Sequence, residues 1–175
     1  MKVRHILPLM AMLMVATFAM AQINIPHTNV SFRFPNGGWK YLKTITPKSS
    51  DAVIYLYSYD GKTIVDAAGD TVPPFMRVYV RRNYADSPFE LAYERSLQQP
   101  FQSLSEYVDG LPGNDGIGYI GAYTSASDGK DYQFRMIYFK DQSSCIEIRL
   151  ETTLDTFESM DGEFQDVLKS VKIGR

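Results

Sequence analysis

Five side chains of the sequence could bind an anion or a sugar. Arg77, Tyr79 and Arg81 alternate along one apolar segment, and Arg135 and Arg149 lie in two later segments of the same kind. An arginine guanidinium holds a carboxylate through paired hydrogen bonds, and a tyrosine supplies a rigid contact surface. If strand register gathers these residues on one sheet face, they form a binding site for a carboxylate, a carbohydrate or an acidic partner.

Two glutamates offer a competing use for the same arginines. Glu147 and Glu151 flank Arg149 on one predicted strand, and cross-strand pairing with them would make the arginines structural. The two carboxylates are four residues apart, about 13 Å along a strand, which is too far for either geometry of glycoside hydrolysis. We therefore expect Glu147 and Glu151 to form a solvated stripe rather than an active site.

The side chains that most enzymes and metal sites need are scarce. After the first 21 residues the chain has one histidine, His27, and one cysteine, Cys145, too few for a Ser-His-Asp, Cys-His or zinc arrangement. The loop from Gly110 to Gly118 lacks the lysine and the following helix of a phosphate loop, and it has too few acidic oxygens for calcium. The sequence predicts a protein without catalysis, cofactor or metal. A hydrolase site assembled from distant positions is the alternative.

The first 21 residues have the layout of a secretory signal peptide. Lys2 and Arg4 precede an apolar run from Ile6 to Phe18, and small residues end the segment at Ala21. The run is too short to span a membrane, and no cysteine follows it to carry a lipid. We predict a signal peptide over 1–21, a single domain over 22–175, no transmembrane or lipid anchor, and a periplasmic or secreted location.

Composition excludes several classes of protein. The chain is 45% apolar and 22% charged with a mean hydropathy of −0.21, which is typical of a globular domain and not of a disordered chain or polytopic membrane protein. Loss of Lys2 and Arg4 with the leader takes the formal charge from −2 to −4. A protein with a net negative charge and no cluster of basic residues is expected to bind nucleic acid poorly. A lone Cys145 is expected to be a buried apolar residue, with an intermolecular disulfide or a reactive thiol as the alternative.

Hydrophobic periodicity predicts strands, then a helix, then strands joined by hairpins, then a second helix. The strands are expected at 30–34, 39–45, 52–59, 75–82, 117–125, 131–140 and 145–152. A capping box at Ser87 and Glu90 starts the first helix, and an apolar stripe predicts the last helix over 156–170. Phe101 to Asp109 keeps a helical spacing after Pro100, which predicts a second short helix or a bent continuation.

The short hairpin turns predict an antiparallel sheet. Most strands are apolar on both faces, so helices are expected to cover both. Tyr55, Tyr57 and Tyr59 share one strand face near Trp39, where they either fill the sheet core or form an aromatic platform. The fold class is α+β.

Three segments resemble the PsbP-like family. They are the entry Phe32-Arg33-Phe34-Pro35 with Trp39, the strand from Gly118 to Tyr123, and the ending from Phe164 to Ile173. The family includes the extrinsic PsbP subunit of photosystem II, the Ran-binding Mog proteins and secreted bacterial members. The resemblance implies an α/β/α sandwich around a central antiparallel sheet, and it transfers no site residue.

The resemblance and the missing catalytic set lead to the same functional expectation. It is a secreted binding or assembly module of the cell envelope that acts through a protein partner. The alternative is a periplasmic carrier or sensor of a small acidic or carbohydrate ligand, held by Arg77, Tyr79, Arg81, Arg135 and Arg149.

Overall fold

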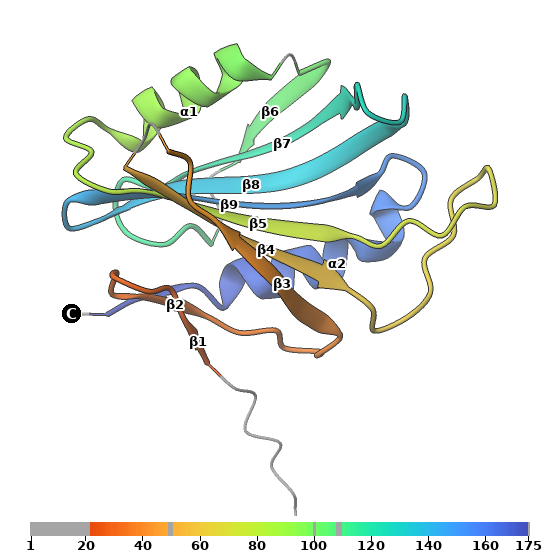
Figure 1. Ribbon diagram of the computed structural model, residues 1–175, viewed down its shortest axis with the longest axis horizontal. Coiled ribbons are helices and arrows are strands. Elements are labelled where there is room, and N and C mark those ends of the chain that lie inside the picture. The colour runs from red at the N-terminus through yellow and green to blue at the C-terminus, as the bar shows by residue number, and fades with distance from the viewer. Residues whose placement is uncertain (1–21, 49–50, 100, 108–109, 175) are drawn as a thin grey trace, which may run out of the picture.

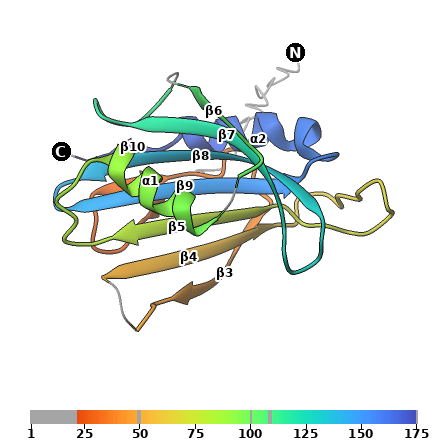
Figure 2. The same cartoon turned by 90° about the horizontal axis from the view of Figure 1, so that it is seen from above.

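The computed structural model describes residues 22–48, 51–99, 101–107 and 110–174. A seven-stranded antiparallel sheet organises the chain, in the order β3-β4-β5-β9-β8-β7-β6 (Figures 1 and 2). The strands of this sheet are β3 (Trp39–Ile45), β4 (Ala52–Tyr59), β5 (Phe75–Arg81), β6 (Ser103–Tyr107), β7 (Ile117–Thr124), β8 (Asp131–Asp141) and β9 (Ser144–Thr153). A two-residue turn joins β8 to β9 and a short loop over 125–130 joins β7 to β8, as the turn residues predict, whereas the longer segment 60–74 connects the paired strands β4 and β5.

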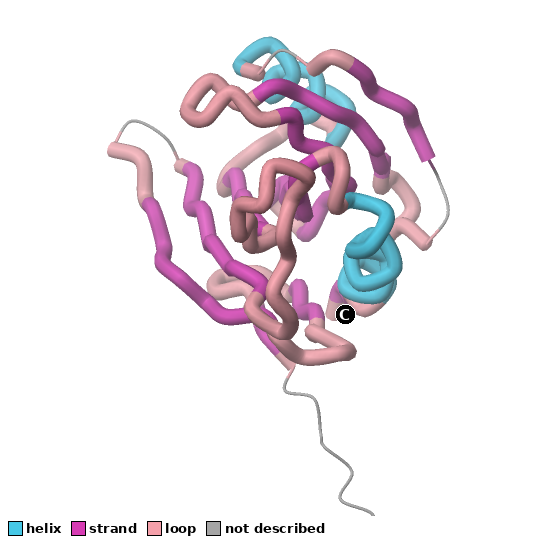
Figure 3. The backbone as a smooth tube through the Cα atoms, turned by 90° about the vertical axis from the view of Figure 1, so that its right-hand side faces the viewer, coloured by secondary structure: helices cyan, strands magenta, loops and turns pink. Residues whose placement is uncertain are grey.

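One helix covers each face of the sheet. Helix α1 (Pro88–Gln98) packs on β8 and β9 from one side, and α2 (Phe157–Lys169) packs on the same two strands from the other. Figure 3 shows the two helices well apart, with strands between them. The predicted α/β/α sandwich around an antiparallel sheet is confirmed.

A second, three-stranded sheet joins the two ends of the described chain. Its strands are β1 (Ile23–Asn24), β2 (Val30–Phe32) and β10 (Lys172–Ile173), with β2 in the middle. It lies on the α2 side of the molecule (Figure 1).

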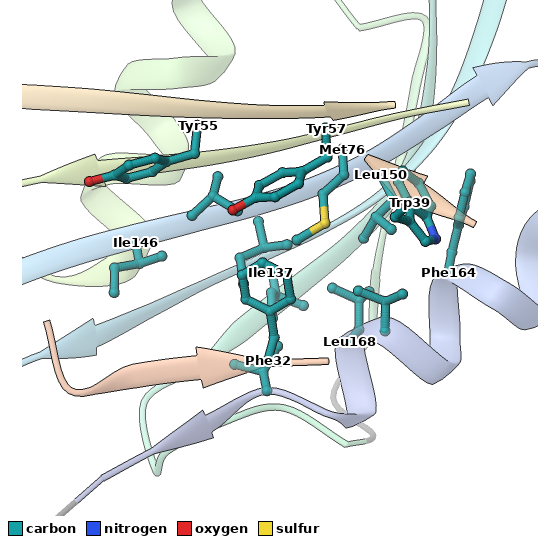
Figure 4. Close-up of a cluster of buried hydrophobic side chains, with 14 of the residues drawn as sticks. Phe32, Trp39, Tyr55, Tyr57, Met76, Ile137, Ile146, Leu150, Phe164 and Leu168 are labelled. Atoms are coloured by element: carbon teal, nitrogen blue, oxygen red, sulfur yellow. The ribbon is translucent and has the colours of Figure 1, made fainter. Parts of the chain in front are cut away.

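The main core lies between the large sheet and α2. Trp39, Tyr57 and Met76 from the sheet contact Phe164 and its neighbours from α2 (Figure 4). Tyr55 and Tyr57 are buried there, so these tyrosines fill the core and do not form an exposed aromatic platform.

The segment after Pro100 corrects one prediction. Ser103 to Tyr107 is an edge strand paired with β7, and not the second helix that the spacing of Phe101, Leu104 and Tyr107 predicts. Gln99 already has an extended backbone, as a residue before proline prefers. The segment also alternates with the period of two of a strand, since Ser103 and Ser105 are separated by Leu104. Pairing with β7 selects this strand conformation. Residues 108–109 lie outside the described residues.

The structure tests the prediction for Cys145 but not the predicted signal peptide. Cys145 is fully buried, so the expectation of an apolar structural cysteine is confirmed. The predicted signal peptide over 1–21 lies outside the described residues. Among those that are described, no helix has the length and apolar character needed to cross a membrane.

Candidate functional site

Helix α1 begins with the capping box that the sequence predicts. The backbone N–H of Glu90 donates to Oγ of Ser87 at 3.3 Å, and the N–H of Ser87 donates to Oε2 of Glu90 at 2.7 Å. Pro88 occupies the first turn, where its missing N–H costs nothing. These contacts fix where the helix starts.

The most apolar side of α1 faces away from the protein. Phe89, Tyr93 and Leu97 are 62%, 60% and 71% exposed, although their spacing places them on one side of the helix. Leu91 and Ala92 face the sheet instead. An apolar stripe on a surface helix ordinarily faces the core, as the stripe of α2 does. In this orientation the described residues leave Phe89, Tyr93 and Leu97 of α1 exposed.

A buried charge network explains the orientation. Arg95, on the inner side of α1, donates through Nε to Oε2 of Glu147 at 3.0 Å. Arg77 of β5 donates to the other oxygen of the same carboxylate, through Nη2 at 2.7 Å and Nε at 3.2 Å. The guanidinium of Arg95 also lies 4.7 Å above the ring of Tyr79. α1 is attached to the sheet through charge as well as through apolar contact.

The prediction that Glu147 belongs to a solvated stripe is wrong. Its side chain is 1% exposed. Burial alone would raise the pKa of Glu147, but Arg77, Arg95 and Arg149 outweigh burial and lower it to about 2. Glu147 is therefore an ionised, paired carboxylate in the layer between α1 and the sheet.

Arg149 lies two residues after Glu147 on β9, in the same layer between α1 and the sheet. Its Nη1 donates to Oε1 of Gln99 at 2.7 Å, and its Nη2 lies 2.6 Å from Oε2 of Glu151 as an ion contact. Its guanidinium is 4.3 Å from the centre of the Phe134 ring and 4.7 Å from that of Tyr123. The buried Nε has no hydrogen-bond partner among the described residues. Arg149 is enclosed by the fold.

A groove runs between α1 and the edge of the sheet. Its volume is about 150 Å³. Phe89, Tyr93 and Ser96 line it from α1, and Leu104 of β6 and Tyr119 of β7 line it from the sheet. The exposed side chains beside this groove define what we call the α1–β6 surface: Phe89, Tyr93 and Leu97 of α1 with Leu104 and Glu106 of β6.

The α1–β6 surface includes one acidic residue, and two more are exposed on α1. Glu106 pairs with Tyr119 across β6 and β7, and it adds to burial in raising the pKa of that tyrosine. Glu90 and Glu94 are exposed on α1. The surface thus combines exposed apolar side chains with negative charge, which suits an apolar and basic ligand.

The structure brings together four of the five predicted site residues. Arg77, Tyr79 and Arg81 alternate on the α1 side of β5, and the register places Arg149 of β9 opposite Arg77. α1 covers this face, where Glu147 pairs with Arg77 and Glu151 pairs with Arg149. The alternative interpretation, in which cross-strand pairing makes the arginines structural, matches the contact between Arg77 of β5 and Glu147 of β9, whereas Arg149 and Glu151 pair along one strand.

Arg135 corrects the expected grouping. It stands opposite Leu150, so the alternation of side chains turns it to the α2 face, away from Arg149. There it donates through Nε and Nη2 to Asp161 of α2, with the second contact at 2.8 Å. Which face a strand residue occupies depends on register, and register is not visible in the sequence.

Arg135 lines a separate cavity of about 320 Å³ between the sheet and α2. Tyr107, Gln165 and Lys169 contribute polar groups to its wall, and Ile137 and Leu168 contribute apolar ones. Burial raises the pKa of Tyr107 to about 12 against the opposing effect of Arg135, so its hydroxyl stays protonated. The cavity has the mixed lining of a small-ligand site.

Metal-binding groups do not gather in the part of the chain that the structure describes. Over 22–48, 51–99, 101–107 and 110–174, no three His, Cys, Asp or Glu side chains are arranged to hold an ion.

The residues of the α1–β6 surface are the ones that sequence reasoning missed. The spacing of Phe89, Tyr93 and Leu97 is visible in the sequence, but it indicates a stripe and not its direction. Leu91, Ala92 and Arg95 form a second side of the helix at spacings of three and four, but an arginine on that side does not indicate that it faces the sheet.

Comparison with known proteins identifies the fold. No protein-family model matches the sequence, and no curated protein matches it significantly. The structure is similar to that of LpqN from Mycobacterium tuberculosis, a protein involved in cell envelope biogenesis, with a TM-score of 0.53, 13% identity, and 89% of this chain and 90% of that chain covered. It is also similar to cyanobacterial PsbP (CyanoP) from Synechocystis, with a TM-score of 0.50, 12% identity, and 89% and 92% covered. The chain has a PsbP-like fold.

Proposed function

We propose that the protein is a secreted, non-catalytic binding module of the cell envelope that holds a partner protein on its α1–β6 surface. The observation that carries the proposal is the outward apolar stripe of α1. Three large apolar side chains, 60% or more exposed, stand next to a groove. Contiguous exposed apolar residues of this kind mark interaction sites, and aromatic anchors contribute most to such contacts.

Charge favours a partner with basic residues beside its apolar ones. Glu106 belongs to the surface, Glu90 and Glu94 are exposed on the same helix as its apolar stripe, and Arg95 is occupied by Glu147. Complementary charge steers association and selects among partners. The partner surface is therefore apolar at its centre and basic at its rim.

His27 and Cys145 are poorly placed for catalysis, which favours a binding role. His27 lies at an exposed turn with a φ of 62°, and Cys145 is buried, with burial as the main cause that raises its pKa to about 12. A thiol with that pKa is a poor nucleophile. The leader segment supports secretion, and the likeness in fold to LpqN and PsbP is compatible with an envelope role.

Native mass spectrometry of the protein purified gently from its own host tests the proposal. We expect a stoichiometric protein companion that the double variant Tyr93→Ser/Leu97→Ser loses. A matched control, Leu42→Ser/Leu154→Ser, removes exposed leucines from elsewhere on the molecule and should keep the companion. Loss in both variants, or retention in both, would contradict docking on the α1–β6 surface.

A second candidate is a carrier of a small acidic ligand. The cavity beside Arg135 favours it, because Lys169 adds a positive charge to a site where Arg135 is already balanced by Asp161. Titration with 8-anilinonaphthalene-1-sulfonate, an anion with apolar aromatic rings, tests this second candidate by fluorescence. Lys169→Gln should weaken binding by about tenfold, and Lys172→Gln, outside the cavity, should not. Equal binding by both variants would exclude the cavity as an anion site.

A further inference from the structure

The two edges of the large sheet differ in how well they are protected against an added strand. β3 has a register shift between Tyr41 and Lys43, and Lys40 and Lys43 project from it. A bulge and lysines on an edge strand are features that discourage pairing with another chain. The edge at β3 is protected.

The edge at β6 has none of these features. Ser103 to Tyr107 pairs with β7 in an unbroken register, and the strand contains no lysine and no proline. Four of its five residues are exposed. An edge strand of this kind offers a row of backbone donors and acceptors to a further strand.

The side chains of β6 alternate between two different environments. Leu104 lines the groove under α1 and Glu106 stands beside Tyr119, so both face the α1 side. Tyr107 lines the cavity near Arg135 on the α2 side, and Ser103 and Ser105 share that side. The outer edge of β6, which pairs with no other strand of the described chain, therefore borders the apolar groove on one side and small polar residues on the other.

An extended segment laid against β6 would use both the edge and the groove. Its backbone would pair with β6, and every second side chain would point to the α1 side, next to Leu104 and Glu106. Strand addition of this kind obtains affinity from main-chain hydrogen bonds and specificity from pockets for alternate side chains. Leu104 and Glu106 are two residues apart, so they would select an apolar and a basic side chain with the same spacing.

We infer that the partner of the proposed binding function contributes an extended segment that pairs with β6 as an eighth strand of the sheet. On the α1 side of this segment an apolar residue enters the groove beside Leu104, and a lysine or arginine two residues away faces Glu106. The inference rests on the proposed docking at the α1–β6 surface and adds the mode of binding and the chemistry of the ligand.

A synthetic peptide tests the inference without knowledge of the natural partner. The probe is fluorescein-labelled Thr-Lys-Thr-Leu-Thr-Lys-Thr, whose symmetrical pattern satisfies either strand direction. Two matched peptides replace both lysines by glutamate or carry N-methyl groups on all of the inner amides, which blocks pairing along both edges and therefore in either strand direction. Fluorescence anisotropy gives affinity, and amide chemical shifts locate the site. We expect the lysine peptide to bind at least tenfold more tightly than either matched peptide and to shift the β6 amides.

Variants of the protein complete the test. Glu106→Lys should reverse the preference between the lysine and glutamate peptides, while Glu158→Lys on α2 should leave it unchanged; both residues are exposed. Equal binding of the N-methylated peptide, an unchanged preference in Glu106→Lys, or no binding at millimolar peptide would overturn strand addition. The proposed function fails separately, when Tyr93→Ser/Leu97→Ser keeps the natural companion.

Discussion

Arg95 and Glu147 meet at the contact between α1 and the sheet, with Nε of the arginine 3.0 Å from Oε2 of the glutamate. The glutamate is 1% exposed and the arginine 19%. A helix that directs an arginine at the sheet must direct its other sides elsewhere, and in α1 the outward side carries Phe89, Tyr93 and Leu97. The buried ion pair and the exposed apolar stripe are two consequences of one helix orientation.

Loss of the Glu147 charge should destabilise the protein strongly. Glu147→Gln leaves Arg77 and Arg95 in the buried layer without a counter-charge, and breaking a buried pair in this way costs about 3–5 kcal/mol. Urea unfolding measures the change. Glu158→Gln, at an exposed position of α2, should change the free energy of unfolding by less than about 1 kcal/mol. A cost below about 1 kcal/mol for Glu147→Gln would show that the network is not structural.

Stability should fall in acid because Glu147 must take up a proton on unfolding. Its pKa is about 2 in the folded protein, compared with the ordinary glutamate value of 4.5 that we take for the unfolded chain. A lowered pKa contributes stability above pH 4.5, and this contribution is lost as the pH falls from 4.5 toward 2. The shift corresponds to about 3 kcal/mol. Urea unfolding between pH 7 and pH 2.5 should therefore show a steeper loss in the wild type than in Glu147→Gln. Parallel curves would contradict this assignment.

Removing the stripe of α1 should leave the fold intact. Tyr93→Ser/Leu97→Ser changes residues that are 60% and 71% exposed, so the free energy of unfolding should stay within about 1 kcal/mol of the wild type. Phe164→Ala, in the main core, should cost about 3–5 kcal/mol in the same assay. A large loss of stability from the stripe variant would mean that Tyr93 and Leu97 pack within the fold.

Cys145 should resist thiol reagents until the protein unfolds. The side chain is fully buried, and burial is the main cause that raises its pKa to about 12. Ellman's reagent should detect no thiol in the native protein and one per chain in guanidinium chloride. Native labelling at the rate of a free cysteine would show that β9 opens locally.

Local signals in the sequence predict most of the elements. Alternating residues bounded by turn residues indicate β4, β8 and β9 to within one residue at most ends, and the capping box marks the start of α1. The segment at 101–109 fails because Phe101, Leu104 and Tyr107 fit a helical period while its alternate residues also fit a strand, and pairing with β7 decides between them.

The candidate site was harder to predict than the fold. Arg135 and Arg149 are both arginines on neighbouring strands, yet one faces α2 and the other α1 because of their register. A charged residue on a strand usually lies in solvent, but Glu147 is buried because Arg77 of a neighbouring strand and Arg95 of a distant helix both bind its carboxylate. Such relationships depend on tertiary packing, which periodicity does not report.

β2 pairs with β1 on one side and with β10 on the other, so the first and last strands of the described chain lie on a shared neighbour. This small sheet is on the opposite side of the molecule from α1 (Figure 1). An attachment made directly beside β1 or β10, whether a fused domain or an immobilising tag, would lie on the side of the molecule opposite α1. The exposed stripe of α1 would then face away from that attachment.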